Sequence, residues 1–288
     1  MTLRAYAKIN LGLQILDKRT DGYHNIETIF HQVNLFDEID LSPNAGGIKF
    51  HCDVRDVPAD ESNLCIKAAK LLQEVTGIPG NVDIVLRKTI PLGAGLGGGS
   101  TDAAAVLKGL RKLCRLEISD SELRTLSALL GSDVPFFIDG GTAFASGRGE
   151  LLEPMDIEIP YWTVVVTPPI HIPTSWAYGN LQRNPHVRRE NLKSLVKDQI
   201  RDPRTLVNKL RNDFEPLVFR QYPEVMRIKE AFVRGGADFA LMSGSGSSVF
   251  GFFSEGKFAR ELAEAFSPVY RTSLTEPMFK PEPIFLSE

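Results

Sequence analysis

Apolar and polar side chains alternate along residues 3–12, which is the pattern of a strand whose two faces differ. The apolar face carries Leu3, Ala5, Ala7, Ile9 and Leu11, and the polar face carries Arg4, Tyr6, Lys8 and Asn10. Side chains two positions apart on one face of a strand lie roughly 6.5–7 Å from each other. We therefore expect Lys8 and Asn10 to point toward one ligand, although a lysine on a solvated strand edge fits the same pattern.

The rest of the chain mixes strands and helices without a strict alternation. In the first half we expect a turn at 17–22, strands at 24–35, 38–42, 48–52, 82–90 and 141–145, and helices at 62–77, 101–114 and 119–130. In the second half we expect strands at 162–166 and on both sides of a turn at 243–248, helices at 175–180 and 223–234, and helix and loop over 183–213. This order predicts an α+β fold rather than a doubly wound sheet, with domains at 1–156 and 157–288.

Composition and charge narrow the class of protein. Of the 288 residues, 43% are hydrophobic and 24% are charged, which is typical of a globular protein with a large core. The net charge of −3 gives no electrostatic reason to expect nucleic acid as a partner. The 3 cysteines are widely spaced and indicate neither a zinc motif nor a disulfide framework. No apolar run is long enough to span a membrane, so we expect a cytoplasmic enzyme with no obligate protein partner.

A glycine-rich run follows the strand predicted at 82–90. Five glycines fall within residues 93–99, and a strong helix former begins directly after them. Glycine lets a backbone approach a ligand closely, and a helix N-terminus offers unpaired N–H groups and the positive end of its dipole. The run therefore predicts a main-chain cradle for the phosphates of a nucleotide.

Two familiar phosphate motifs do not fit this run. Residues 93–98 have the spacing of a dinucleotide fingerprint, but Pro91 separates the strand from the first glycine and two helices follow in succession. The Walker motif requires a lysine before its serine or threonine, and here Gly99 precedes Ser100. A plain glycine turn with Ser100 or Thr101 as the helix N-cap stays open.

Phosphoryl transfer also needs a group that positions the attacking hydroxyl and a charge that stabilises the transferred phosphoryl group. Asp133 is a candidate proton acceptor because it follows a Gly-Ser turn and precedes an apolar segment, although a helix or turn cap suits the same position. Lys8 is the candidate cation, because a positive charge would lower the pKa of a nearby aspartate or stabilise the transferred group.

Rings and hydroxyls elsewhere suggest where an acceptor would bind. Tyr23 and His24 follow a tight turn and suit a nucleobase, and Trp176 and Tyr178 offer further rings, with a structural role open for each. The serines and glycines of residues 243–248 would add donors beside the first loop or form a flexible hairpin tip.

Three segments in order, 4–12, 91–104 and 240–250, resemble the three motifs of the GHMP small-molecule kinases. The resemblance spans essentially residues 4–251 and is most specific at 7–11, 21–24, 95–100, 131–136 and 242–246. It implies ATP-dependent phosphorylation, with Mg²⁺, of the 2-hydroxyl of a cytidine diphosphate-linked methylerythritol in the non-mevalonate route to isoprenoid precursors. It also implies a two-lobed α+β fold with the active site between the lobes. The N-terminal lobe would resemble ribosomal protein S5 domain 2, and the C-terminal lobe would be ferredoxin-like.

The resemblance implies a role for each candidate residue. Asp133 would be the catalytic base and Lys8 its charged partner. The acceptor substrate would contact Asn10, Tyr23, His24, Thr174 and Tyr178, with Trp176 as an alternative ring. ATP would contact Asn63, Lys88, Pro91, Leu92, Gly93, Ala94, Gly95, Leu96, Gly97, Gly98, Gly99, Ser100 and Thr101. No carboxylate is identified as a metal ligand, so Mg²⁺ is expected on the ATP phosphates and Ser100. Arg148 stands near the substrate base, where a small or apolar residue would be expected.

Two other functions stay open. One is another GHMP kinase, acting on homoserine, a mevalonate derivative or a sugar. The other is a nucleotide-binding regulator without turnover. Tyr23 and His24 favour a substrate that contains a base, and the presence of both Lys8 and Asp133 favours an enzyme.

Overall fold

The structure is a computed structural model that describes residues 1–78, 80–182 and 189–282. The strands of these residues are β1 (Thr2–Lys18), β2 (His24–Pro43), β3 (Ile48–Cys52), β4 (Val82–Arg87), β5 (Thr142–Ser146), β6 (Leu151–Pro154), β7 (Trp162–Thr167), β8 (Phe239–Met242), β9 (Val249–Phe253) and β10 (Arg271–Thr275). The helices are α1 (Leu64–Thr76), α2 (Gly98–Leu113), α3 (Asp120–Ser127), α4 (Val134–Asp139), α5 (Thr174–Asn180), α6 (Leu192–Gln199), α7 (Pro203–Lys209), α8 (Glu215–Gln221), α9 (Pro223–Arg234) and α10 (Gly256–Phe266).

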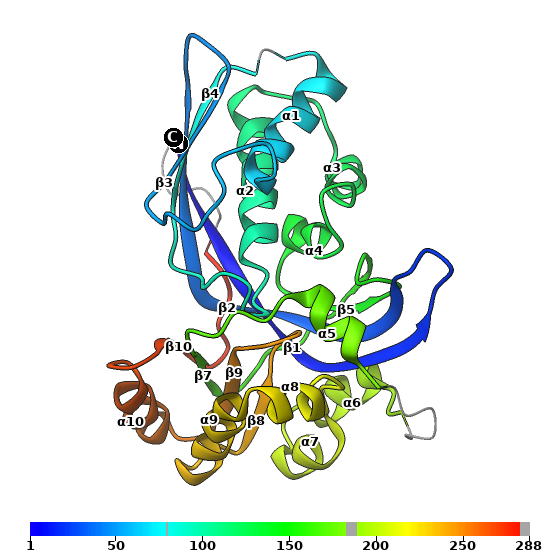
Figure 1. Cartoon of the computed structure of the whole chain (residues 1–288), viewed down its shortest axis with the longest axis vertical. Helices are drawn as coiled ribbons and strands as arrows, with labels where there is room; N and C mark the ends of the chain where they lie inside the picture. The colour runs from blue at the N-terminus through cyan, green and yellow to red at the C-terminus, as the bar shows by residue number, and fades with distance from the viewer. Residues whose placement is uncertain (79, 183–188, 283–288) are drawn as a thin grey trace.

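These elements build two sheets, one in each half of the molecule (Figure 1). The larger sheet runs β3-β4-β2-β5-β6 with β1 paired to β2, and the smaller sheet runs β10-β7-β9-β8. Neighbouring strands are antiparallel except for the parallel pair β3 and β4. Helices α1–α4 lie together beside the larger sheet, and α9 and α10 pack against the smaller one (Figure 1). The predicted α+β architecture is confirmed.

Strand β1 connects the two halves. Leu3 packs in the core around α1 and α2, Ile9 in a central core shared with residues of the second half, and Ile15 in the core of the smaller sheet. Both faces of the middle of β1 are buried, so Lys8 is only 3% exposed. The alternative of a solvated edge lysine is therefore wrong, because the second half of the chain covers this part of the strand.

The larger sheet departs from the predicted boundaries where polar residues are buried. β2 is a single strand through residue 43, whereas two separate strands were expected, because Asp37 is fully buried inside it instead of marking a turn. β4 ends at Arg87 rather than at residue 90, because the N–H groups of Thr89 and Ile90 donate to the Asp37 carboxylate and not to a neighbouring strand. One buried aspartate accounts for both differences.

The helices lie close to the predicted segments, with one informative shift. α2 begins at Gly98 instead of residue 101, so the last glycines of the run belong to its first turn. Helices α6 and α7 form within the predicted segment 183–213, of which residues 183–188 lie outside the described residues. The elements α4, α8, α10, β6 and β10 had no counterpart in the sequence pattern. The division of the chain at residue 156 stays a prediction.

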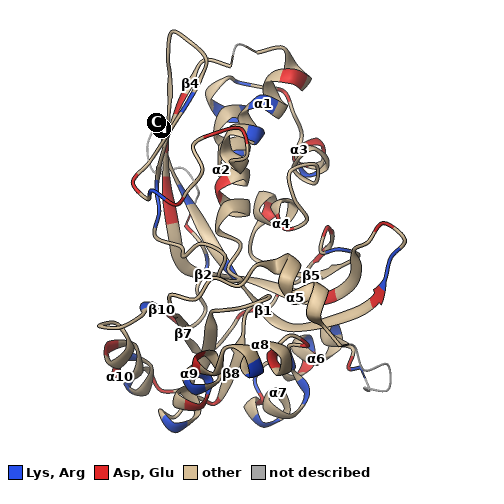
Figure 2. Cartoon of the chain, in the orientation of Figure 1, with Lys and Arg blue, Asp and Glu red and all other residues tan. Residues whose placement is uncertain are grey.

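Charged residues of both signs are mixed along the chain. In Figure 2, Lys and Arg are interspersed with Asp and Glu over both halves, and neither sign is concentrated in one half. Within the described ranges, no helix is both long enough and apolar enough to cross a membrane.

Candidate active site

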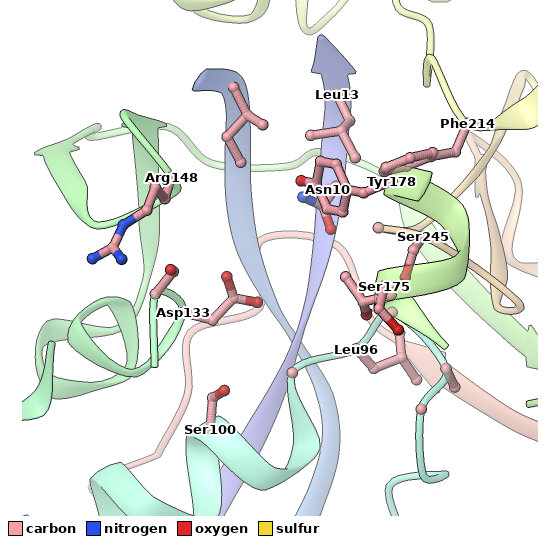
Figure 3. Close-up of a pocket in the computed structure, with 18 of the residues that line it drawn as sticks. Asn10, Leu13, Leu96, Ser100, Asp133, Arg148, Ser175, Tyr178, Phe214 and Ser245 are labelled. Carbon is pink, nitrogen blue, oxygen red and sulfur yellow. Dashed lines mark hydrogen bonds between the residues drawn. The ribbon is translucent and has the colours of Figure 1, made fainter. Parts of the chain in front are cut away.

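A cavity of about 780 Å³ lies where β1, the glycine-rich loop and α5 come together (Figure 3). Its lining includes most of the residues that the sequence singled out, namely Lys8, Asn10, Tyr23, His24, residues 91–100, Asp133, Thr174 and Tyr178. Three further candidates, Asn63, Lys88 and Thr101, are not part of this lining. Residues from both halves of the chain therefore meet at one cavity.

The glycine-rich loop joins β4 to α2 and has a backbone that requires glycine. The φ angles are 59° at Gly93, 77° at Gly95 and 73° at Gly97, in the left-handed region that other residues rarely adopt. Gly97 is the N-cap of α2, and no side chain caps the first N–H groups of this helix. The alternative of Ser100 or Thr101 as the N-cap is therefore wrong. The N–H groups of the first turn are available to an anion.

The second serine-glycine segment, residues 243–248, holds the glycine-rich loop in place. The Ser243 hydroxyl donates to the carbonyl oxygen of Gly95 (2.9 Å), and the Ser248 N–H donates to the carbonyl oxygen of Ala94 (3.2 Å). A Cβ at Gly95 would collide with the carbonyl oxygen of Ser243. Ser243 and Ser248 are completely buried, so this segment is not a flexible hairpin tip.

Lys8, Asn10 and Asp133 form a polar group at the centre of the cavity. The Lys8 Nζ donates to Asn10 Oδ1 (2.7 Å) and lies 3.5 Å from Asp133 Oδ2. The same ammonium lies 4.7 Å from the centroid of the Phe30 ring. Burial lowers the pKa of Lys8, and the Asp133 carboxylate opposes this shift by favouring the charged amine. The pair thus places a desolvated cation beside a carboxylate.

Asp133 is at the N-cap position of α4 but does not act as a cap. Its side chain makes no capping hydrogen bond, and 33% of that side chain is exposed. Figure 3 shows its carboxylate between Ser100 of α2 below and Arg148 above. The cap alternative is therefore wrong as far as hydrogen bonding is concerned, and the carboxylate is accessible from the cavity.

Aromatic rings line another part of the cavity. The rings of His24 and Tyr178 are stacked, with centroids 5.3 Å apart, and Phe214 meets Tyr178 edge to face at 4.9 Å. Burial raises the pKa of Tyr178, so its hydroxyl stays neutral. Trp176 packs against Tyr222 instead and is not part of the lining. Of the two rings considered on α5, Tyr178 is the one that reaches the cavity.

The remaining acceptor candidates lie at the rim. Tyr23 is 55% exposed, and the Arg148 guanidinium lies 5.1 Å from the centroid of its ring. Arg148 also forms an ion pair of 3.4 Å with Glu150. Thr174 and Ser245 are linked by a hydrogen bond between their hydroxyls (3.3 Å), which joins α5 to the second serine-glycine segment.

The three ATP candidates outside the lining have partners within the protein. Asn63 is the N-cap of α1 and accepts a hydrogen bond there. Thr101 is buried in the first turn of α2. Lys88 is buried behind the glycine-rich loop, where its ammonium is paired with Asp37 and Asp102.

The cavity also contains residues that sequence reasoning did not identify. Lys18 lies at the end of β1, and Ser132 directly precedes Asp133 in a segment that had been singled out. Phe214 comes from the beginning of α8, a helix that the pattern did not predict. Adjacency to a known candidate would have found Ser132, but no local signal marks Phe214.

The side chains that line the cavity provide few ligands for a metal ion. Among the described residues, no group of three or more His, Cys, Asp or Glu side chains could hold a metal ion. Asp133 is the only acid among the described lining residues.

Comparison with known sequences identifies the class. The pattern described as "GHMP kinases N terminal domain" matches residues 63–141, and "GHMP kinases C terminal" matches residues 191–270. Together these matches cover more than half of the chain and include the glycine-rich loop and Asp133. The chain belongs to the GHMP kinases, and it is an ATP-dependent small-molecule kinase.

Individual relatives narrow the family. The chain is 45% identical to the 4-diphosphocytidyl-2-C-methyl-D-erythritol kinase of Chlorobium phaeobacteroides, over 97% of this chain and 98% of that one. It is 44% identical to the enzyme of the same name from Prosthecochloris aestuarii, with the same coverage. A crystal structure of 4-(cytidine 5'-diphospho)-2C-methyl-D-erythritol kinase superposes with a TM-score of 0.83 at 35% identity, covering 97% of this chain and 100% of that one. Within the GHMP kinases, the chain belongs to this family, as the resemblance predicted.

A more distant structure shows how widely the fold is shared. Homoserine kinase from Cytophaga hutchinsonii superposes with a TM-score of 0.73 at 17% identity, over 96% of this chain and 95% of that one. At that identity the likeness shows the fold alone. The acceptor must therefore be inferred from the near relatives and the site.

Proposed function

We propose that this protein transfers the γ-phosphoryl group of ATP to the 2-hydroxyl of 4-diphosphocytidyl-2-C-methyl-D-erythritol, giving the 2-phosphate and ADP. The reaction belongs to the non-mevalonate route to isoprenoid precursors. The observation that carries the proposal is the placement of the Lys8–Asp133 pair in one cavity with the glycine-rich loop and the stacked rings of His24 and Tyr178.

The ATP phosphates bind to the main chain of the glycine-rich loop and the first turn of α2. The helix N-terminus supplies N–H donors and the positive end of the dipole, and the positive φ angles bring the backbone close to the ligand. No lysine of the Walker type is needed, because backbone donors perform its role.

Asp133 accepts the proton of the attacking hydroxyl. The acceptor oxygen forms a bond to the γ-phosphorus as the bond from that phosphorus to the bridging oxygen of ADP breaks. Lys8 stabilises the negative charge on the transferred group, because its ammonium is desolvated and lies only 3.5 Å from the Asp133 carboxylate. Asn10 orients that ammonium through its Oδ1.

The cytosine base binds near the stacked rings of His24 and Tyr178, with Tyr23, Thr174 and Asn10 completing the acceptor site. A base gains stacking energy on such rings, and the imidazole offers a hydrogen bond to its edge. The ring cluster lies on a different side of the cavity from Arg148 (Figure 3). Asp133 lies between Ser100 and Arg148, apart from the ring cluster (Figure 3). This separation fits a substrate whose reacting hydroxyl is at some distance from its base.

A magnesium ion fits this donor set only in company with ATP. Mg²⁺ prefers oxygen ligands and commonly keeps several waters while binding substrate phosphates. The hydroxyl of Ser100, in the first turn of α2 and in the cavity lining, is the protein oxygen we assign to it. When bound, the ion would neutralise charge on the β- and γ-phosphates.

We also propose that the enzyme works in the cytoplasm on small-molecule substrates alone, without nucleic acid, a membrane or an obligate protein partner. The ATP loop and the catalytic pair belong to an N-terminal lobe at 1–156, and the smaller sheet belongs to a C-terminal lobe at 157–288.

The test is a coupled assay of ADP release against four acceptors: the cytidylylated methylerythritol, homoserine, mevalonate and a hexose. We expect activity with the first acceptor only, and strongly reduced activity in the Asp133→Asn control. Activity confined to homoserine, mevalonate or the hexose would show that the protein is a kinase for a different acceptor. ATP binding without turnover on any acceptor would favour a nucleotide-binding regulator.

A further inference from the structure

Behind the glycine-rich loop lies a buried cluster of three charged side chains, which we call the rear cluster: Asp37 of β2, Lys88 after β4 and Asp102 of α2. The Lys88 Nζ contacts Asp37 Oδ2 and lies 2.8 Å from Asp102 Oδ2. The exposed fractions of the three side chains are only 0–4%. None of the three lines the cavity.

The rear cluster is attached to both ends of the loop. At the entrance, Asp37 Oδ1 accepts the N–H groups of Thr89 (2.5 Å) and Ile90 (2.8 Å), the two residues before Pro91. At the exit, Asp102 belongs to the second turn of α2, the helix that follows the loop. Lys88 joins these two attachments, because its ammonium binds both carboxylates at once.

Lys88 also packs against the backbone at the end of the loop. A Cβ built on Gly98, the first residue of α2, would lie 2.9 Å from the Lys88 Nζ. The ammonium is thus packed directly behind the backbone that would hold the phosphates. Two of the three N–H donors of this ammonium bind Asp37 and Asp102, neither of which lines the cavity.

We infer that Lys88 is a positioning residue, which with Asp37 and Asp102 fixes the two ends of the phosphate loop and does not itself contact ATP. This inference rests on the proposed function insofar as the loop binds ATP. It departs from the sequence-based expectation that Lys88 is an ATP ligand. One carboxylate oxygen, Asp102 Oδ1, has no hydrogen-bond partner among the described residues, and burial raises the pKa of Asp102, so its charged form is held less firmly than that of a fully hydrogen-bonded carboxylate.

The experiment measures binding of a non-hydrolysable ATP analogue to Asp37→Asn, Asp102→Asn and Lys88→Met, each alone and as the Asp37→Asn/Asp102→Asn pair. No acceptor is present, so an incorrect acceptor assignment cannot affect the result. Hydrogen exchange of the amides of residues 93–100 is recorded in parallel. Lys108→Met is the control, because Lys108 is a partly buried lysine of α2 that donates to the Ile138 carbonyl away from the loop.

We expect Asp37→Asn to raise the Kd of the analogue about tenfold, because a loop that is no longer held by its bonds to Asp37 must be ordered when the ligand binds. Asp102→Asn should have a smaller effect in the same direction, and the pair should be non-additive because both residues act through Lys88. Loop amides should exchange faster in each variant that binds weakly. Lys108→Met should change neither the Kd nor the exchange of the loop.

Two results would overturn the inference. If Lys88→Met weakens binding while both aspartate variants bind normally, Lys88 contacts ATP directly. If binding and loop exchange are normal in all folded variants, the rear cluster has no part in the loop. Should Lys88→Met fail to fold, the two aspartate variants still decide, because each keeps the lysine paired with one carboxylate.

Discussion

Two lysines, each almost completely buried and each beside a carboxylate, are used in opposite ways in this molecule. Lys8 faces a cavity, and its single acidic partner, Asp133, keeps 33% of its side chain exposed. Lys88 is enclosed with two carboxylates that are themselves buried. Burial on its own lowers the pKa of both amines, but Asp102 and Asp37 reverse the shift for Lys88 and raise its pKa above the ordinary value.

The difference shows what distinguishes a reactive ion pair from a structural one. The charge of Lys88 is compensated inside the protein, so it stabilises the protein's own loop. The charge of Lys8 is only partly compensated, at 3.5 Å, and its partner is accessible to a substrate. An incompletely compensated charge in a cavity can stabilise charge that develops during a reaction.

The largest expected effect comes from the accessible carboxylate. Asp133→Asn should lower kcat by about 10²–10⁴-fold, which is the usual contribution of a positioned proton acceptor. Binding of ATP should be nearly unchanged, because the phosphates bind to the loop backbone. Steady-state kinetics together with equilibrium ATP binding check both statements. Near-normal turnover would remove Asp133 from the role of base.

The same substitution at the two lysines should have opposite consequences for stability. Lys88→Met leaves two buried carboxylates without a cation and should lower the free energy of unfolding by about 3–5 kcal/mol. Lys8→Met removes a desolvated charge whose partner is open to solvent, so its free energy of unfolding should stay the same or rise slightly. Denaturant unfolding of both variants measures the difference. Equal losses in the two variants would mean that Lys8 is as structural as Lys88.

Much of the fold could be predicted from the sequence, because alternation and helix signals are local. The differences occur where a buried polar residue satisfies distant groups. Asp37 looks like a strand-breaking residue along the chain, but it is paired with Lys88 and caps two loop amides, so β2 continues through it. A sequence pattern contains no information about which groups meet across the sheet.

The site shows the same division. The glycine-rich loop and the environment of Asp133 have local signatures, so they could be identified from the sequence. The family resemblance implies that Lys88 contacts ATP, but in the structure its ammonium lies behind the loop, paired with Asp37 and Asp102. Phe214 reaches the cavity through a helix with no local signal, and only the folded chain brings it to Tyr178.

A third buried group, His31, sharpens the comparison because burial alone lowers its pKa, to about 4, with no opposing carboxylate. The folded protein therefore disfavours the protonated ring. The contribution of neutral His31 to the free energy of unfolding is fully present above its pKa in the unfolded chain, near 6.5, and is lost as the pH falls toward 4. Between pH 7 and pH 5 the loss should be about 2 kcal/mol. The difference between wild type and His31→Gln in unfolding at the two pH values measures it, and parallel pH profiles would contradict it.

The smallest expected effect concerns the His24 ring, and it tests whether the acceptor site extends from Lys8 and Asp133 to the stacked rings. His24→Ala removes one ring of the stack with Tyr178 and should raise the KM for the cytidylylated acceptor about tenfold, since an aromatic pair contributes about 0.5–1.5 kcal/mol beyond its buried area. The KM for ATP and kcat should change little, because neither the loop nor Asp133 is touched. Trp176→Phe is the matched control, since Trp176 packs on Tyr222 outside the cavity. An unchanged acceptor KM in His24→Ala would separate the ring stack from base recognition and limit the acceptor site to the surroundings of Lys8 and Asp133.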